Sequence, residues 1–242
     1  MPYDRELALA RQAAMAAGEN AIRLYAAGIS SQVKADGTPV SNADTDNERL
    51  LRERIEAAYP NDGIVGEEGT RKPGASGRRW ILDPIDGTRD FVRGDKTWCV
   101  LMALEEGGDP VLGIAHFPEL AETYWASRGA GAFRNGERLT LGNTNGKQAD
   151  SPGMADFLAR LWVLKSYGGR LQAGSAAQIS DVWYERGGKI WDLAPVQTII
   201  EEAGWRYFAP DGTRRSDAGR AIACTPALES KVRAFLSSVR PR

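Results

Sequence analysis

Residues 78–88 constrain the fold of this chain more than any other stretch. Their sequence, RRWILDPIDGT, is a compact apolar run that ends in two aspartates, Asp83 and Asp86. Residues 63–68, GIVGEE, repeat the pattern and end in two glutamates. Short apolar runs of this kind are typical of buried strands, and α/β sheets bind ligands beyond the carboxyl ends of their strands. The two segments therefore predict strands that deliver carboxylates into a cleft.

Apolar residues recur at helical spacing over residues 4–27 and 41–58, which predicts a helix in each. The polar segment 34–44 between them predicts a turn or hairpin. Between residues 97 and 141, apolar runs separated by tight turns predict antiparallel strands. We therefore predict an α+β N-terminal half, residues 1–141.

Residues 142–153 are poor in apolar side chains and predict a surface connection to a second half. That half, residues 142–242, alternates apolar runs with helical patterns and is α/β in character. Its elements are expected at residues 161–167, around Ala176, at 193–203, at 221–226, and in a final helix from Ala227. The two halves are expected to form one compact catalytic unit.

Charge, hydropathy and cysteine usage exclude several classes of protein. Thirty-one basic residues balance thirty-two acidic ones, so we expect no nucleic-acid partner. No stretch approaches the roughly 20 apolar residues that span a bilayer, and the N-terminus lacks a signal peptide's apolar block. We therefore expect a cytoplasmic protein without a membrane partner. The single histidine, His116, lies without a nearby partner, and Cys99 and Cys224 occupy apolar runs typical of buried side chains. One histidine and two cysteines are too few for a zinc cluster or a histidine-based catalytic triad. The composition therefore favours chemistry carried out by carboxylates.

Five carboxylates form an acidic constellation: Glu67, Glu68, Asp83, Asp86 and Asp192. Each also has a structural interpretation. The glutamate pair fits a solvated turn, the first two aspartates fit a helix cap, and Asp192 fits the N-cap of a helix containing Pro195. Their grouping favours a site, since Asp83 and Asp86 bracket a proline at the end of an apolar strand.

Carboxylates that leave a buried edge together repel each other unless a proton or a cation neutralises them. Oxygen ligands alone select a hard ion, so the sequence predicts Mg²⁺, with Mn²⁺ as a substitute. Thr88 adds a hydroxyl close by. Gly87 leaves room for a phosphate to approach backbone amides at the start of a helix. This spacing predicts metal-assisted phosphoryl transfer.

Three motifs, GEE at residues 66–68, DPIDGT at 83–88 and WD at 191–192, resemble in this order the inositol monophosphatase family of lithium-sensitive, metal-dependent phosphatases. Residues 34–44, KADGTPVSNAD, also look like the family's mobile loop and the start of its second helix. The resemblance implies a layered αβαβα sandwich, usually dimeric, with metal ions between its two halves. It further implies hydrolysis of a phosphate monoester of a small, polar metabolite.

The resemblance also implies residue roles. The matched metal ligands are Glu67, Asp83, the backbone carbonyl of Ile85, Asp86 and Asp192. Asp44 and Thr88 match the pair that, with Glu67, orients and deprotonates the attacking water. The candidates for binding substrate are Gly87, Thr88, Glu185, Asp192, Lys34 and Arg93. Lys34, in the mobile loop, is a candidate for closing over the phosphate, and a solvated lysine fits the sequence as well.

Substrate choice depends on residues outside these motifs. Glu185 lies seven residues before Asp192, where relatives place a carboxylate that grips hydroxyl or amino groups of the substrate. The segment around Arg93 and Trp98 resembles the histidinol-phosphatase branch more than the inositol branch. The resemblance thus ranks histidinol phosphate first, inositol phosphate second, and 3′-phosphoadenosine 5′-phosphate, the substrate of a bisphosphate nucleotidase, third.

Two other interpretations stay open. In the first, the chain is an interaction or regulatory module that keeps the phosphatase fold. The presence of every residue that matches a metal ligand of the family favours catalysis instead. In the second it is a sugar bisphosphatase, which needs basic residues to hold a second phosphate. Arg89, Arg93 and Lys96 are candidates, although a surface cluster explains them better. Between Gln178 and Glu185 the chain is shorter than the family pattern, beside the substrate pocket.

Overall fold

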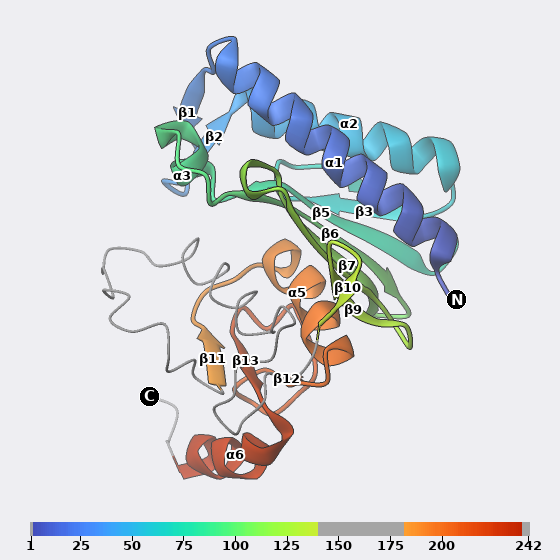
Figure 1. Cartoon of the computed structure of the whole chain (residues 1–242), viewed down its shortest axis with the longest axis vertical. Coiled ribbons are helices and arrows are strands. Elements are labelled where there is room, and N and C mark those ends of the chain that lie inside the picture. Colours follow the sequence, from blue (N-terminus) through green and yellow to red (C-terminus); the bar gives the residue numbers. More distant parts are fainter. Residues whose placement is uncertain (1, 140–181, 239–242) are drawn as a thin grey trace.

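The computed structural model describes residues 2–139 and 182–238. Five layers follow one another through the molecule, as Figure 1 shows: a helix pair, a large sheet, a central helix, a small sheet and a C-terminal helix. This is the predicted αβαβα sandwich. The predicted division into halves at residues 141 and 142 lies outside the described residues, as do the elements expected at 161–167 and around Ala176 and most of the shortened segment after Gln178.

The first layer consists of α1 (Asp4–Ala26) and α2 (Asn42–Ala58). Both match the predicted helices to within a residue. The inner face of α1 is a stripe of fully buried alanines, and their small side chains let it lie close to the sheet. Between the helices, β1 (Ser31–Val33) and β2 (Pro39–Ser41) form the hairpin that the polar segment predicts.

Within residues 2–139, eight strands form the large sheet in the order β10-β9-β8-β7-β6-β5-β3-β4. Their bounds are β3 Gly63–Gly66, β4 Arg71–Lys72, β5 Arg78–Asp86, β6 Cys99–Glu106, β7 Asp109–Phe117, β8 Glu122–Ser127, β9 Gly131–Arg134 and β10 Glu137–Arg138. Among the strands that the structure describes, β3 and β5 pair in parallel and the other neighbours in this sheet are antiparallel. Layers cover the sheet on both faces, so its central strands are buried along nearly their whole length.

The central helix α5 (Ile190–Glu202) packs on the face of the sheet opposite α1 and α2 (Figure 1). It approaches β7 so closely that a Cβ on Gly113 would lie 2.2 Å from the carbonyl oxygen of Pro195. Only glycine therefore fits at residue 113. The sequence predicts this helix from residue 193, and it begins three residues earlier.

The small sheet lies beyond α5, in the order β11-β13-β12. Its strands are β11 (Val182–Glu185), β12 (Arg206–Phe208) and β13 (Ala221–Cys224). The last layer, α6 (Glu229–Ser238), follows a short 3₁₀ turn at Pro226–Leu228, which is why the helix begins after the predicted Ala227. A second 3₁₀ turn, Pro118–Leu120, follows β7, and the short helix α3 (Thr88–Arg93) follows β5.

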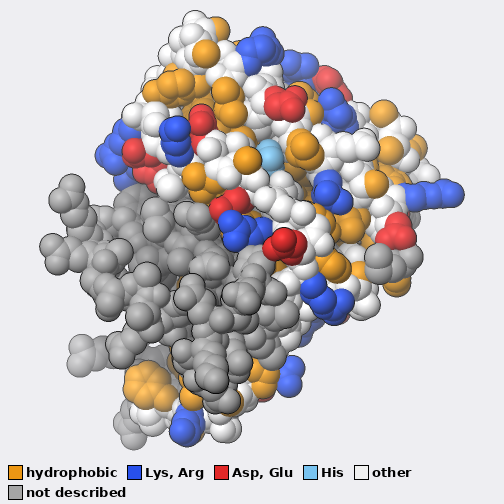
Figure 2. Space-filling model, in the orientation of Figure 1, with side chains coloured by type: hydrophobic (Ala, Val, Ile, Leu, Met, Phe, Trp, Pro, Cys, Tyr) orange, Lys and Arg blue, Asp and Glu red, His pale blue; other side chains and the backbone are white. Residues whose placement is uncertain are grey.

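No helix in the described ranges combines the length and the apolar character needed to cross a membrane. On the face in Figure 2, acidic and basic side chains are interspersed over the described residues. Both cysteines, Cys99 and Cys224, are buried, as the sequence predicts. His116 is also buried, and its Nδ1 lies 2.8 Å from the hydroxyl oxygen of Thr123, a partner that the sequence did not reveal.

Candidate active site

Strand β5 brings the first two carboxylates of the site together. Residues three apart on a regular strand point to opposite faces of a sheet. The pairing of β5 with β6 shifts register between Asp83 and Asp86, and this irregularity turns both side chains toward one place. Asp83 is 1% exposed and Asp86 is 9% exposed, so both carboxylates are withdrawn from solvent.

Helix α5 contributes the third carboxylate, Asp192, from its first turn. Its Oδ2 accepts a hydrogen bond of 2.7 Å from the backbone N–H of Lys189, which precedes the helix. The interpretation of Asp192 as the N-cap is therefore wrong, because the helix begins at Ile190 and Lys189 holds that position. One oxygen from each of Asp83, Asp86 and Asp192 lies within 4.8 Å of the others. A helix N-terminus also favours negative charge at this point.

The buried carboxylate of Asp83 lacks a full set of partners. Its Oδ1 accepts a hydrogen bond from the backbone N–H of Ile85 at 3.1 Å, whereas its buried Oδ2 has no donor among the described residues. Burial raises its pKa well above the ordinary value, and the charges of Glu67, Asp86 and Asp192 raise it further. An orphaned oxygen amid carboxylates fits a hard divalent cation, which prefers oxygen ligands.

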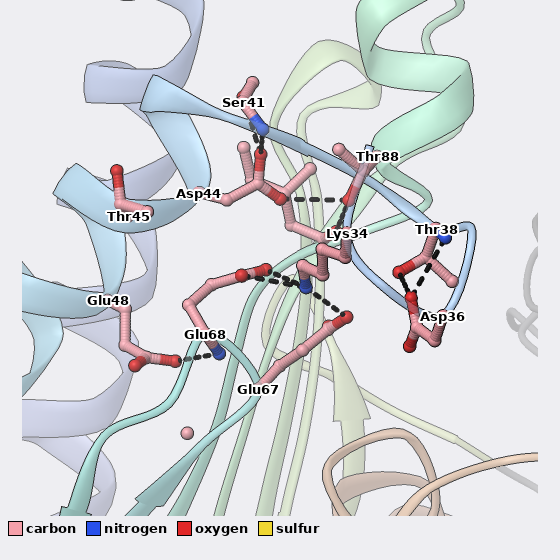
Figure 3. A network of polar contacts seen from close by, with 12 residues as sticks. Lys34, Asp36, Thr38, Ser41, Asp44, Thr45, Glu48, Glu67, Glu68 and Thr88 are labelled. Atoms are coloured by element: carbon pink, nitrogen blue, oxygen red, sulfur yellow. Dashed lines mark hydrogen bonds and ion pairs between the residues drawn. The ribbon is translucent and has the colours of Figure 1, made fainter. Parts of the chain in front are cut away.

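Glu67 and Glu68 follow strand β3 and share one lysine. Figure 3 shows Lys34 reaching from the β1–β2 hairpin between the two carboxylates. Its Nζ lies 3.2 Å from Glu67 Oε1 and 2.8 Å from the nearest oxygens of Glu68. Burial raises the pKa of Glu67, and Asp192 adds to the rise while Lys34 opposes it. Burial likewise raises the pKa of Glu68 to about 7.

Asp44 and Thr88 lie on the other side of Lys34 in Figure 3. Thr88 Oγ1 is 2.9 Å from Asp44 Oδ1 and 3.1 Å from the carbonyl oxygen of Ile85, and we assign its single hydrogen to the closer acceptor, Asp44. Ser41 donates to the other carboxylate oxygen of Asp44 from its hydroxyl, at 2.5 Å, and from its backbone N–H, at 2.8 Å. Burial raises the pKa of Asp44, and the bonds from Ser41 and Thr88 oppose that rise.

Gly87 sets the start of helix α3 beside this group. Its φ of 92° lies in the left-handed region that glycine adopts without a steric penalty. The helix then begins at Thr88, as the sequence predicts, and the backbone carbonyl of Gly87 accepts from the N–H groups of Asp90 and Phe91.

The structure describes two further predicted substrate residues, Glu185 and Arg93. Glu185 ends β11, and its Oε1 accepts hydrogen bonds from the backbone N–H groups of Arg186 and Gly187 at 2.9 and 3.0 Å. Arg93 ends α3 and is exposed.

Sequence reasoning missed two residues that brace the site. Glu48, on α2, accepts hydrogen bonds from the backbone N–H groups of Glu68 and Thr70 at 2.7 and 2.8 Å, and so fixes the turn after β3. The thiol of Cys99 lies 3.8 Å from Asp86 Oδ2 on the neighbouring strand. Nothing in the sequence marks either contact, because both depend on how distant elements pack.

Residues 3–158 match the inositol monophosphatase family. The match spans more than half of the chain and includes four of the five carboxylates of the constellation. The chain belongs to the inositol monophosphatase family. It is therefore a phosphatase, of a family that depends on metal ions, and its buried acidic cluster agrees with that dependence.

Relatives within the inositol monophosphatase family carry different names. The histidinol-phosphatase of Chlorobaculum parvum is 37% identical over 195 residues, 72% of this chain and 74% of that protein. The inositol-1-monophosphatase of Rhizobium meliloti is 34% identical over 234 residues, 87% of this chain and 88% of that protein. The crystal structure of the extragenic suppressor protein suhB from Bartonella henselae superposes with a TM-score of 0.75 at 25% identity, covering 98% of this chain and 100% of that one.

Proposed function

We propose that this family member is a Mg²⁺-dependent histidinol-phosphatase. The metal-dependent part rests on the convergence of Asp83, Asp86 and Asp192, and on the buried Oδ2 of Asp83, which has no donor among the described residues. The substrate is supported by the sequence around Arg93 and Trp98 and by the 37% identity to a relative of that name.

The proposed metal ligands are Glu67, Asp83, the carbonyl of Ile85, Asp86 and Asp192. When bound there, Mg²⁺ supplies positive charge that neutralises the phosphate and lowers the pKa of water. The protein's own part is to hold these oxygens together against their mutual repulsion. The raised pKa values of Glu67 and Asp83 reflect that repulsion as well as burial.

Thr88, Asp44 and Glu67 are the proposed acceptors for the proton of the attacking water. Thr88 donates its hydrogen to Asp44, which leaves a lone pair of Oγ1 free to accept from water. As the water oxygen bonds to phosphorus and the ester bond breaks, a proton moves from water toward Thr88 and from Thr88 toward Asp44. The raised pKa of Asp44 suits this role, because a buried carboxylate accepts a proton more readily. The alkoxide that leaves is protonated in turn from water.

The remaining candidates are assigned to the substrate. Lys34 and the backbone around Gly87 and Thr88 hold the phosphate, and Lys34 already reaches the acidic cluster from its hairpin. Glu185, Asp192 and Arg93 are proposed to contact the alcohol part. For Glu185 this requires release from its bonds to the backbone of Arg186 and Gly187.

The direct test is phosphate release from a panel of monoesters with Mg²⁺ and with chelator. We expect release only with Mg²⁺, and a kcat/KM for histidinol phosphate at least ~10-fold above those for inositol 1-phosphate and 3′-phosphoadenosine 5′-phosphate. Equal release in chelator would overturn the metal-dependent mechanism. A preference for another ester would overturn the assignment of histidinol phosphate as the substrate and leave the metal-dependent mechanism intact.

Inositol-1-monophosphatase is the second candidate, supported by the 34% identity of the Rhizobium meliloti relative over 87% of this chain. A regulatory module, which the sequence also leaves open, would release no phosphate from any ester. A sugar bisphosphatase would need Arg89, Arg93 or Lys96 for a second phosphate. We also propose a cytoplasmic homodimer, which light scattering of the purified protein would test for its oligomeric state.

A further inference from the structure

Helix α2 presents two buried carboxylates to the site from one face. Asp44 and Glu48 are four residues apart, about one helical turn, and are 1% and 4% exposed. Figure 3 shows both side chains reaching from α2 into the same network, Asp44 toward Thr88 and Glu48 toward the backbone nitrogen of Glu68. A single helix face thus contacts both segments that carry the proposed acceptors of the water's proton. The proposed function uses Asp44 but gives Glu48 no part.

Both carboxylate oxygens of Glu48 bind the backbone of the turn after β3. Its Oε2 accepts from the N–H of Glu68 at 2.7 Å, and its Oε1 accepts from the N–H of Thr70 at 2.8 Å. The N–H of Gly66 donates to the carbonyl of Thr70 at 2.9 Å, which closes the turn across Glu67. A charged acceptor makes both bonds to Glu48 stronger than bonds between neutral groups. Glu67 therefore lies between two residues whose backbones are held in place.

Gly66 leaves the space that the carboxylate of Glu48 occupies. The three atoms nearest to a Cβ built on Gly66 all belong to that carboxyl group, and the Cβ would overlap them. Gly66 is the last residue of β3, and its φ lies outside the left-handed region, so the backbone itself admits an alanine there. The glycine of the GEE motif is thus required for space, because Glu48 packs directly against its Cα.

We propose that Glu48 is a positioning residue of this enzyme: by holding the turn after β3, it keeps the carboxylate of Glu67 at the metal site and beside the water that Thr88 orients. The inference rests on the proposed function, which makes Glu67 a metal ligand and a proton acceptor. Glu48 acts through the backbone of residues 66–70. Removing a partner that orients a metal ligand typically costs about 10–100-fold in metal affinity or activity.

Position and charge make different predictions for this residue. Glu48→Ala removes the contact and also a negative charge that attracts a cation. Gly66→Ala keeps the charge and displaces the carboxylate from its place against the turn. A positional effect therefore appears in both variants, whereas a purely electrostatic effect appears in Glu48→Ala alone.

The experiment measures three quantities for each protein: the Mg²⁺ concentration for half-maximal activity, kcat and KM at saturating Mg²⁺, and the rise in melting temperature with Mg²⁺. The test proteins are Glu48→Ala, Gly66→Ala and the double variant. Glu48→Gln, which keeps the volume and one acceptor oxygen, is the milder substitute if Glu48→Ala does not fold. Asp62→Asn is the matched control, since it removes a carboxylate that is 2% exposed, precedes β3 and accepts hydrogen bonds from Arg78 and Trp80 on β5.

We expect Glu48→Ala and Gly66→Ala each to raise the half-maximal Mg²⁺ concentration by ~10-fold and to lower kcat, while KM for the ester changes by less than ~3-fold. The rise in melting temperature at a fixed Mg²⁺ concentration should shrink in both, and this readout does not depend on catalysis. The double variant should match Glu48→Ala alone, because both changes act on one contact. Asp62→Asn should melt at a lower temperature and keep the Mg²⁺ requirement of the unaltered chain.

The proposal is overturned if the Glu48 variant keeps the unaltered Mg²⁺ requirement, or if Asp62→Asn raises it as much, as a general loss of stability would predict. An effect in Glu48→Ala with none in Gly66→Ala would also overturn it, in favour of charge alone. Failure of the proposed function shows instead in the unaltered chain, as phosphate release that is absent or equal in chelator. The melting readout then still decides on Glu48, and an unaltered chain that gains no stability from Mg²⁺ would overturn both proposals.

Discussion

The hydroxyl of Thr88 donates to the carboxylate of Asp44 at 2.9 Å, although 44 residues separate them along the chain. Both side chains are buried, and Ser41 occupies the other oxygen of Asp44. The contact links the second helix to the DPIDGT motif, so one hydrogen bond connects two segments that the resemblance assigns to water activation.

Replacing Thr88 by alanine should lower kcat by ~100-fold or more, because the water loses its proton acceptor and Asp44 loses a donor. Thr88→Ser keeps the hydroxyl and should recover most of the activity. Thr45→Ala, a neighbouring exposed threonine on α2, is the control and should behave as the unaltered enzyme. Steady-state kinetics on the preferred ester measure the effect. A fully active Thr88→Ala enzyme would contradict the assignment.

Asp86→Asn should abolish activity and the response of the protein to metal. In the unaltered chain, millimolar Mg²⁺ should raise the melting temperature, because an ion that binds only the folded state stabilises it. The variant has lost one ligand charge at nearly constant volume, so this rise should vanish. Without metal, the variant should be at least as stable as the parent, since it relieves repulsion on Asp83.

Calorimetric melting with and without Mg²⁺ measures both effects. Asp46→Asn, an exposed carboxylate on α2, is the control. The metal assignment is refuted if Asp86→Asn melts higher with Mg²⁺ by as much as the parent.

Local sequence predicts much of this fold, because most helices and strands can be recognised from the pattern of their own residues. The alanine stripe of α1, the Ser41 cap of α2 and the apolar run of β5 each indicate an element and its bounds. The apolar pattern that begins at Leu193 places the start of α5 three residues too late, because it does not reveal the first turn, which begins at Ile190.

The geometry of the site depends on features that no short segment shows. Asp83 and Asp86 face one another only because the pairing with β6 shifts between them. Asp192 reaches them because α5 lies against β7 at Gly113. Glu48 and Cys99 support the site through contacts between elements, so the sequence gives no local sign of their roles.

His116 should make the protein less stable in mild acid. Burial lowers its pKa from 6.5 to about 4, so the folded state keeps it neutral while the unfolded chain protonates it. The stability that neutral His116 gives the folded state is fully present above pH 6.5 and is lost as the pH falls toward 4. Between pH 7 and pH 5 the free energy of unfolding should fall by about 2 kcal/mol from this group. Urea unfolding at both pH values measures it, and His116→Asn should remove that part of the pH dependence. An equal fall in the variant would assign the effect to other groups.

Gly113→Ala should push α5 away from β7 and so displace Asp192 from the other carboxylates of the site. The added methyl meets the carbonyl of Pro195, so the variant should lose ~1–3 kcal/mol of unfolding free energy. Because α5 also carries Asp192, the Mg²⁺ concentration for half-maximal activity should rise. Gly187→Ala places a methyl where no atom lies within 4 Å and is the matched control. Chemical unfolding and a Mg²⁺ titration of activity provide the readouts, and a variant unchanged in both would show that this close approach does not position the helix.

Locating a bound metal tests the central claim most directly. Crystals grown with Mn²⁺ should show an anomalous difference peak at coordination distance, about 2.0–2.3 Å, from carboxylate oxygens of Asp83, Asp86 and Asp192. Crystals of Asp86→Asn should lack that peak or show it weakened. A Mn²⁺ peak elsewhere on the protein, with these three carboxylates bare at saturating metal, would contradict the account.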